Sequence, residues 1–182
     1  MDAEDQELIS RLLESSTRNS AFSVVVRTYQ ERLYWHIRKM VLSHDDANDV
    51  LQNTFMKAWS GIDGFRGDAR FSSWLYRIAT NETLTFLTNK RMRNIASMED
   101  EEQLLLNQLH ADSFFNGDEA QLKLQEAILT LPEKQRLVFN MKYFDDLTYD
   151  QMEEILQTSV GALKASYHHA VKKIGKYLEQ EN

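Results

Sequence analysis

Residues 147–174 read LTYDQMEEILQTSVGALKASYHHAVKKI, and they indicate the fold more clearly than any other stretch of the chain. Thr148 is placed to cap a short helix that ends at Leu156. Residues 157–158 make a turn, and Ser159 can cap the helix that follows. Two helices joined by a turn of three or four residues form a helix-turn-helix, whose second helix enters the major groove of DNA. The stretch therefore predicts a DNA-binding domain, although a helical hairpin with a solvated lysine face has the same spacing.

The second of these helices divides into two faces. Its buried stripe is predicted to consist of Val160, Leu163, Tyr167, Val171 and Ile174. The side chains on the other face are suited to base edges near the start of the helix and to phosphates further along. The predicted duplex-contacting residues are Ser159, Gly161, Lys164, Ala165, Ser166, His168, His169, Lys172 and Lys173. His168 and His169 point about 100° apart on a helix, so they cannot share an ion, and no metal site is expected.

The net charge of −7 argues at first against a nucleic-acid partner, but the charge is unevenly distributed. Residues 1–20 carry a net −3, and residues 94–120 contain seven acids and no lysine or arginine. These two segments account for −10, so the rest of the chain carries +3. Local patches, more than the total charge, set the affinity for a phosphate backbone. The composition is therefore compatible with DNA binding.

Several classes of protein are disfavoured by what the sequence lacks. The chain has no cysteine, which excludes disulfides and thiolate sites. The N-terminus is acidic and polar and no apolar run approaches membrane-spanning length, so we expect a cytoplasmic protein with no membrane insertion of its own. No glycine-rich phosphate loop or nucleophile elbow is present, and the Asp145–Asp146 pair is expected to supply only turn charges. We therefore expect neither an enzyme nor a cofactor.

Apolar periodicity and the scarcity of proline and glycine predict an all-α chain. Helices are expected at about residues 21–41, 44–59, 71–93, 119–130, 132–144, 148–156 and 159–179. Within the acidic stretch between the third and fourth, LLLNQL at residues 104–109 either forms a short helix or packs elsewhere. The prediction is two small helical domains joined by an acidic linker: residues 1–93, with an N-terminal extension at 1–19, the linker at 94–118, and a four-helix domain with the helix-turn-helix at 119–182.

The second predicted helix, the loop after it and the start of the third helix carry a series of aromatic residues. Ser43 or His44 can cap the helix, which is expected to bury Val50, Leu51, Phe55 and Trp59. The loop and the next helix start combine Phe65, Phe71, Trp74 and Tyr76 with Arg66, Arg70 and Arg77. Aromatic rings interleaved with cations can stack the bases of a single strand and hold its backbone. Core packing is the alternative, which we favour for Trp74, while both interpretations stay open for Phe65.

Three stretches resemble one known family. DANDVLQNTFMKAW (46–59) resembles region 2.2 of the extracytoplasmic-function sigma factors of bacterial RNA polymerase, whose pattern is DAxDxxQxxFxxxW. FRGDARFSSWLYRIATN (65–81) is similar to the promoter-melting region that follows, and residues 129–174 are similar to region 4. The resemblance covers about residues 20–93 and 120–178, with both blocks in order. It departs from the family pattern at Ser166, His169 and Val171, where arginines are usual, which implies a weaker grip on phosphates.

The resemblance implies a set of partners and residue roles. The helix at 44–59 docks on the clamp helices of the polymerase's largest subunit, and the second domain lies at the flap region. The implied polymerase-binding residues are Asp46, Asp49, Gln52, Asn53 and Phe55. The −10 element of the promoter is opened and held, with one base flipped out, by Phe65, Arg66, Arg70, Phe71, Arg77, Asn81, Lys90 and Arg91. The duplex-contacting residues read the −35 element, the linker follows the RNA exit path, and an anti-sigma factor is a further expected partner.

Two other classes of protein remain as alternatives. A two-domain transcriptional regulator that acts without polymerase would not need the DANDVLQNTF helix or the loop aromatics. A helical adaptor that binds only proteins would not need the lysines of the last helix. Asp46 and Asp49 are also explained by the favourable interaction of acids with the positive end of a helix dipole.

Overall fold

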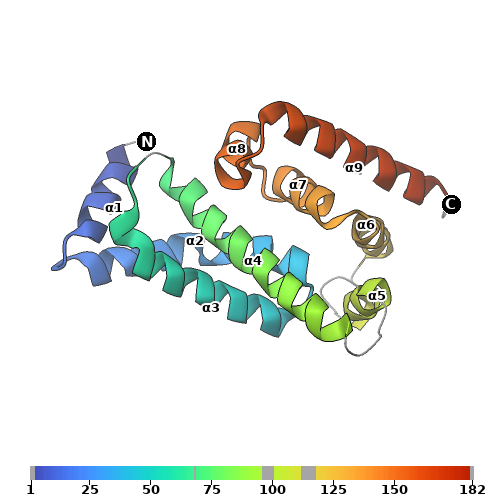
Figure 1. Cartoon of the computed structure of the whole chain (residues 1–182), viewed down its shortest axis with the longest axis horizontal. Helices are drawn as coiled ribbons and strands as arrows, with labels where there is room; N and C mark the ends of the chain where they lie inside the picture. The colour runs from blue at the N-terminus through green and yellow to red at the C-terminus, as the bar shows by residue number, and fades with distance from the viewer. Residues whose placement is uncertain (1–2, 68, 96–100, 112–117, 181–182) are drawn as a thin grey trace.

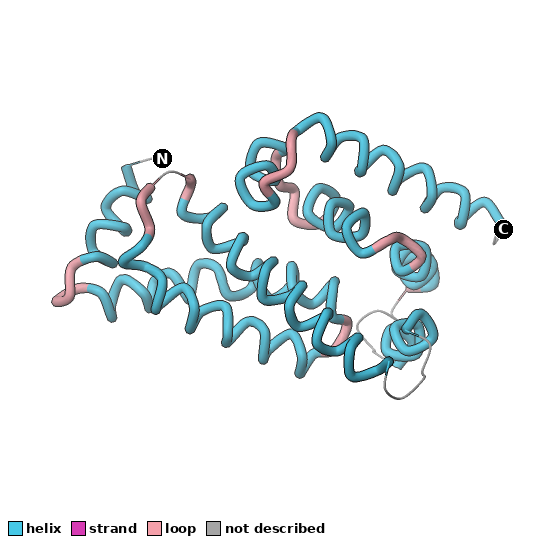
Figure 2. The backbone as a smooth tube through the Cα atoms, viewed as in Figure 1, coloured by secondary structure: helices cyan, strands magenta, loops and turns pink. Residues whose placement is uncertain are grey.

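The computed structural model describes residues 3–67, 69–95, 101–111 and 118–180, and the regular structure within these ranges is helical. The first domain contains α1 (Ala3–Leu13), α2 (Arg18–Val41), α3 (His44–Gly61), the 3-10 helix η1 (Ile62–Gly64) and α4 (Phe71–Ile95). After α5 (Glu101–Ala111), the second domain contains α6 (Glu119–Leu129), α7 (Glu133–Tyr143), α8 (Tyr149–Leu156) and α9 (Val160–Gln180). Figure 1 shows these two groups of helices, with α5 beneath α6, and Figure 2 shows the short loops within each group. The predicted all-α fold with two helical domains is confirmed.

The helix ends follow local capping chemistry. Ser43 Oγ accepts a hydrogen bond from the Asp46 backbone N–H at 3.2 Å and caps α3. Thr148 and Gln151 form a reciprocal capping box at the start of α8. Gln157 ends α8 in the left-handed conformation, with φ 52°, which allows the tight turn into α9. These caps place α8 and α9 as the predicted helix-turn-helix.

The buried stripe of α9 differs from the prediction at one position. Leu163 and Ile174 are buried and Tyr167 is half-buried, as expected. Val171 is 44% exposed, however, and Ala170 is fully buried in its place. Both positions fit a spacing of three or four residues along the stripe, but the methyl group of Ala170 lets α9 pack closely against α6.

The N-terminal extension contains a helix that the sequence pattern did not predict. Although α1 is rich in charge, Ile9 and Leu12 are buried in the core of the first domain. Arg18, at the start of α2, donates from Nε to the Leu12 carbonyl at 2.8 Å and also pairs with Asp63 at 2.5 Å. These contacts tie α1 to α2 and η1, so α1 is part of the first domain.

The linker also contains ordered structure. The LLLNQL segment lies in α5, which answers the question that periodicity left open. Leu109 of α5 is fully buried against Leu42, which follows α2, and Leu129 at the end of α6. Residues 96–100, which include the first half of the acidic run MEDEEQ (98–103), and residues 112–117 lie outside the described residues. Among the described residues, no helix has the length and apolar character of a membrane span.

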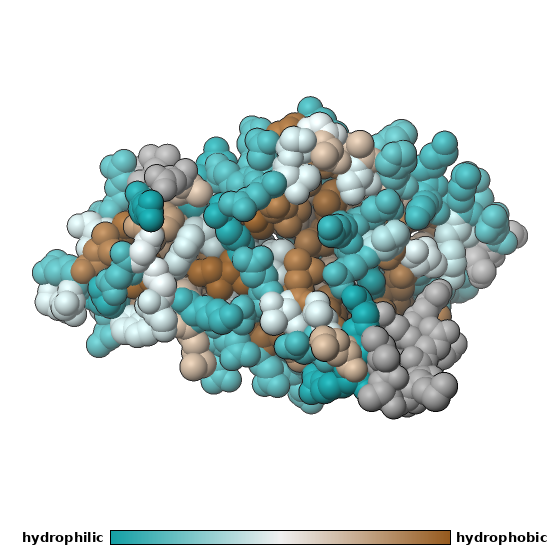
Figure 3. Space-filling view, viewed as in Figure 1, coloured by the Kyte–Doolittle hydropathy of each residue, from teal (hydrophilic) through white to brown (hydrophobic). Residues whose placement is uncertain are grey.

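The two domains share one core along a seam where α4 packs on α8 and α2 packs on α7. Leu75 and Ala79 of α4 belong to the same apolar cluster as Met141, Met152 and other residues of the second domain. Figure 3 shows polar residues over most of the visible face, with apolar residues appearing between them in the middle of the molecule. The linker therefore joins two domains that are in direct contact.

The role of α1 can be tested with two neighbouring leucines. Leu12→Ala should lower the free energy of unfolding by about 2–5 kcal/mol, because it leaves a cavity in a fully buried site. Leu13→Ala removes the same atoms from a side chain that is 44% exposed and should have little effect. Urea unfolding followed by circular dichroism measures both. Equal stability of the two variants would show that α1 does not contribute to the folded core.

Candidate nucleic-acid and polymerase interfaces

The first part of α9 presents an exposed face opposite its buried stripe. Ser159, Gly161, Lys164, Ala165, His168, His169, Lys172 and Lys173 are exposed, and Ser166 is half-buried. A Cβ built on Gly161 would meet no atom within 4 Å, so this position is open to close approach by another molecule. Lys164 lies with its Nζ 5.6 Å from the centre of the Tyr149 ring, which holds the ammonium group beside the turn. The nine residues predicted to contact duplex DNA thus lie together at one end of the second domain.

A basic groove continues along α9. It has a volume of about 350 Å³ and is lined by His169, Lys172, Lys173, Lys176 and Gln135 of α7. Three lysines around one hollow can hold phosphates without reading sequence. Gln135 was not predicted as part of this surface, because only the packing of α7 against α9 brings it there.

The predicted aromatic platform of the first domain requires a correction. Phe65 is only 8% exposed, and its ring packs against Phe71 and Trp74 with centroids 5.7 Å and 5.3 Å away. Phe71 is fully buried. The core interpretation is therefore correct for both rings in this structure, as it is for Trp74, because neither Phe65 nor Phe71 offers a face to solvent. An apolar ring on a glycine-rich loop still gains more from burial than from exposure.

The cations near this cluster are largely engaged by acidic residues or carbonyls. Arg77 donates to the Glu154 carbonyl, and Arg70 Nη1 lies 3.8 Å from Glu154 Oε1. Arg91 pairs with Glu133 at 2.8 Å. All three contacts cross from α4 or the segment before it to the second domain. Elsewhere Lys90 pairs with Asp46 at 2.8 Å, while Arg66 and Asn81 are exposed.

An apolar groove lies between α2 and α3. Its volume is about 370 Å³, and it is lined by Phe22, Val26, Gln52, Phe55, Met56, Trp59 and Ser60. Met56 is 61% exposed and Trp59 is 37% exposed, so the prediction that Trp59 is buried is wrong. Asp49, Gln52 and Asn53 are also exposed, whereas Phe55 and Asp46 are half-buried. Exposed large apolar side chains gathered in a groove with polar residues at its edge are typical of a protein-binding surface.

A buried polar network crosses the seam between α2 and the loop that follows α7. Asp145 Oδ2 lies 2.6 Å from His36 Nδ1, and its Oδ1 accepts from Lys39 Nζ at 3.1 Å. His36 Nε2 lies 3.0 Å from Thr80 Oγ1 of α4. Burial raises the pKa of Asp145, but attraction and hydrogen bonding to His36 and Lys39 outweigh it and hold the pKa below its ordinary value. Asp146 is a solvent-exposed turn residue as predicted, whereas Asp145 is 3% exposed.

The comparisons with known proteins agree with the resemblance seen in the sequence. Residues 25–93 match Sigma-70 region 2, and residues 121–174 match Sigma-70, region 4. The chain is 32% identical over 166 residues to the ECF RNA polymerase sigma factor SigW of Bacillus subtilis, covering 87% of this chain and 89% of that protein. It is 29% identical to the RNA polymerase sigma-H factor of Pseudomonas aeruginosa, covering 97% of this chain and 94% of that protein.

Two solved structures have the same fold. CnrH, in complex with the cytosolic domain of CnrY, has a TM-score of 0.71 at 21% identity, with 98% of this chain and 99% of that chain covered. The sigma factor RpoE, in complex with the anti-sigma factor NepR from Bartonella quintana, has a TM-score of 0.67 at 20% identity, with 88% and 98% covered.

A two-domain helical protein with a helix-turn-helix at its C-terminal end and an apolar groove on its N-terminal domain has the architecture of a transcription initiation factor. The chain belongs to the extracytoplasmic-function subfamily of the sigma-70 family of RNA polymerase sigma factors. It therefore acts in transcription initiation with RNA polymerase. The alternative of a regulator that acts without polymerase is not favoured.

The contribution of Asp145 should depend on pH. Asp145→Asn should lower the free energy of unfolding by roughly 1–3 kcal/mol at neutral pH, because the amide loses charge-assisted bonds. The folded-state pKa of Asp145 is below the ordinary value of 3.8, so the stabilisation is present above that value and is lost as the pH falls through the lowered pKa. The free energies of unfolding of the two proteins, measured in urea, should therefore approach each other as the pH falls below 3.8 and meet only below the lowered pKa.

Asp146→Asn is the matched control, because it makes the same change on a side chain that is 96% exposed. Asparagine also tolerates the positive φ of 51° at this position. This variant should unfold like the wild type at every pH. A similar loss for both variants would mean that the buried network contributes no more than the surface charge does.

Proposed function

We propose that this sigma factor uses three separate surfaces in initiation, one for core polymerase and two for different elements of the promoter. The groove between α2 and α3, with the exposed polar residues of α3, docks on the clamp helices of the polymerase's largest subunit. The exposed face of α9 reads the −35 element, and residues of α4 and the loop before it hold the melted −10 strand. The observation that supports this assignment best is the exposure of all but one of the nine duplex-contacting residues on α9.

The polymerase surface extends beyond the residues that the sequence predicted. Asp49, Gln52 and Asn53 supply polar contacts, and Met56 and Trp59 supply apolar area. Interfaces of this kind bury an apolar centre inside a polar rim. Asp46 is half-buried and bound to Lys90, so its role is to fix α3 against α4 more than to contact a partner.

The contacts to the −10 strand are assigned to polar residues that are exposed, or that can leave their present partners in the second domain. Asn81 is exposed on α4 and suits an amide contact to a flipped base. Arg66 is exposed, and Arg70 and Arg77 can bind phosphates once Glu154 no longer occupies them. Phe65 and Phe71 support this surface from below as core residues.

Further partners and the compartment follow from the family. The fold neighbours were solved in complex with CnrY and with the anti-sigma factor NepR. We extend this to the present chain and propose that an anti-sigma factor holds it until a signal arrives. Because its partners are RNA polymerase and promoter DNA, the protein acts in the cytoplasm. The polymerase carries out the chemistry of RNA synthesis.

The docking groove can be tested with two exposed methionines. Met56→Ser removes apolar area from the groove and should weaken binding to core polymerase about tenfold, as truncation of a central interface residue does. Met92→Ser makes the same change on α4, outside the groove, at a side chain with similar exposure of 66%. Fluorescence anisotropy of labelled sigma factor with core polymerase measures both. Unchanged binding of the Met56 variant would contradict the assignment of the groove.

The two DNA surfaces can be separated by run-off transcription and permanganate footprinting with core polymerase. Lys164→Ala with His169→Ala should weaken promoter binding tenfold to a hundredfold, since a good base contact is worth about 1–3 kcal/mol. Asn81→Ala should still recruit polymerase to duplex promoter but open it poorly. A template with a pre-melted −10 bubble should rescue the Asn81 variant more than the Lys164/His169 variant. Equal rescue would contradict the division between the two surfaces.

A further inference from the structure

We propose that Arg18 is a positioning residue for promoter opening: it fixes the 3-10 helix η1 and, through η1, the loop that carries Arg66 and Arg70. The inference rests on the proposed function of this loop in holding the melted −10 strand. It also gives the N-terminal extension a role in that step, because Arg18 joins η1 to the end of α1.

The guanidinium of Arg18 binds two elements at once. Its Nε donates to the Leu12 carbonyl at 2.8 Å and its Nη2 to the Leu13 carbonyl at 3.5 Å. The last carbonyls of a helix have no partner within it, so these bonds cap the end of α1. Nη2 also donates to Asp63 Oδ1 at 2.5 Å, and Nη1 donates to Oδ2 at 3.3 Å. A guanidinium that meets both oxygens of a carboxylate accepts few other geometries, so Arg18 fixes η1 against α1.

The 3-10 helix η1 depends on such contacts for its position. It is three residues long, Gly61 precedes it and Gly64 ends it. So short a helix gains too few hydrogen bonds to offset the entropy of ordering it, and glycine raises that entropy further. Figure 1 shows α1 beside the segment that joins α3 to α4, where η1 lies. The buried Ile62 holds η1 from inside the domain, and the bond from Arg18 to Asp63 holds it from the side of α1.

The position of η1 determines where the loop after it begins. The Phe65 backbone N–H donates to the Ile62 carbonyl at 3.0 Å, and the Phe65 ring packs against Phe71 at the start of α4. The exposed Arg66 follows directly. A shift of η1 would therefore move Arg66 relative to α4, which carries Asn81. Contacts to one DNA strand need both elements in register.

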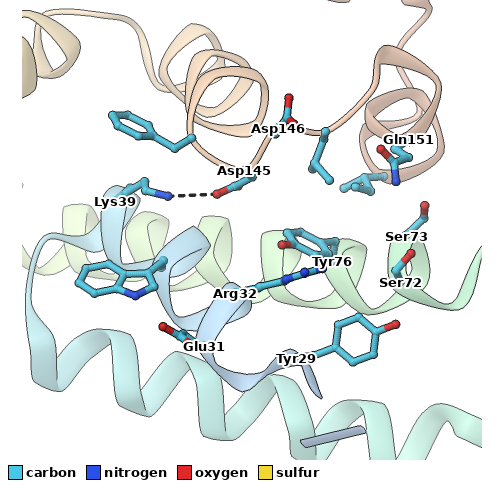
Figure 4. Close-up of a pocket in the computed structure, with 14 residues that line it drawn as sticks. Tyr29, Glu31, Arg32, Lys39, Ser72, Ser73, Tyr76, Asp145, Asp146 and Gln151 are labelled. Atoms are coloured by element: carbon cyan, nitrogen blue, oxygen red, sulfur yellow. Dashed lines mark hydrogen bonds and ion pairs between the residues drawn. The ribbon is translucent and has the colours of Figure 1, made fainter. Parts of the chain in front are cut away.

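The exposure of the ion pair indicates that it positions η1 more than it stabilises the domain. The Asp63 side chain is 67% exposed and the Arg18 side chain is 22% exposed. Figure 4 shows a contrasting pair, Lys39 and Asp145, whose carboxylate is only 3% exposed. Exposed ion pairs contribute little to the free energy of unfolding, because water solvates both charges in either state. Loss of the Arg18 contact should therefore change the local order of η1 more than the stability of the whole domain.

The first test uses hydrogen exchange of the free full-length protein, followed by mass spectrometry. In Arg18→Ala, the amides of residues 62–67 should exchange about tenfold faster than in the wild type, because η1 opens more often. Arg27→Ala is the matched control: Arg27 is exposed about 14 Å further along α2 and donates to the Ser23 carbonyl of its own helix. It removes the same charge and should exchange like the wild type. Urea unfolding should show that Arg18→Ala loses less stability than Leu12→Ala does.

The second test follows promoter opening by permanganate footprinting with core polymerase. Arg18→Ala should bind core polymerase like the wild type but open a duplex promoter about tenfold more slowly, because fewer molecules hold the loop in position. Asp63→Ala should show the same defect. Combining the two changes should add little, because both remove one interaction. Arg27→Ala should open the promoter at the rate of the wild type.

Three results would overturn the inference: unchanged exchange of residues 62–67 in Arg18→Ala, faster exchange with normal opening, or defects that multiply in the double variant. Asn81→Ala separates this failure from failure of the proposed function. If Asn81→Ala opens the promoter poorly while any of these results is found, the strand-binding surface stands and the positioning role of Arg18 does not. Normal opening by Asn81→Ala would contradict that surface instead, and the Arg18 results would still decide the inference.

Discussion

The structure depends on the burial of one carboxylate between two domains. Removing the charge of Asp145 from water is costly unless cations and hydrogen-bond donors meet it, and His36 and Lys39 do so from α2. Thr80 of α4 bonds to the other nitrogen of His36 and so fixes its orientation. These contacts accept few other geometries, so they determine how α7 and α8 lie on the first domain. The positions of the other cross-domain pairs follow from that placement.

The local features of the fold could be predicted from the sequence because short-range chemistry determines them. The caps at Ser43 and Thr148, the turn after Leu156 and the exposed face of α9 all follow from residues within a few positions of one another. Helix α1 was missed because its charge hides a small apolar face, on which Ile9 and Leu12 are buried and Leu8 packs beside them. Ala170 was missed because a spacing of three or four residues fits its neighbour Val171 equally well.

The features that could not be predicted join residues distant in the chain. The bond between His36 and Asp145 spans 109 residues, and that between Arg77 and Glu154 spans 77. No local pattern distinguishes the buried Asp145 from the exposed Asp146 beside it. For the same reason, the sequence motif gave no indication of Met56, which lines a groove only because α2 supplies the other wall.

The uneven distribution of charge explains why such an acidic chain can still be a DNA-binding protein. A basic α9 surface alone would hold any duplex, since phosphate contacts carry no sequence information. In this structure Arg77 and Arg91 of α4 are engaged by Glu154 and Glu133 of the second domain, whereas the predicted duplex-contacting face of α9 is exposed.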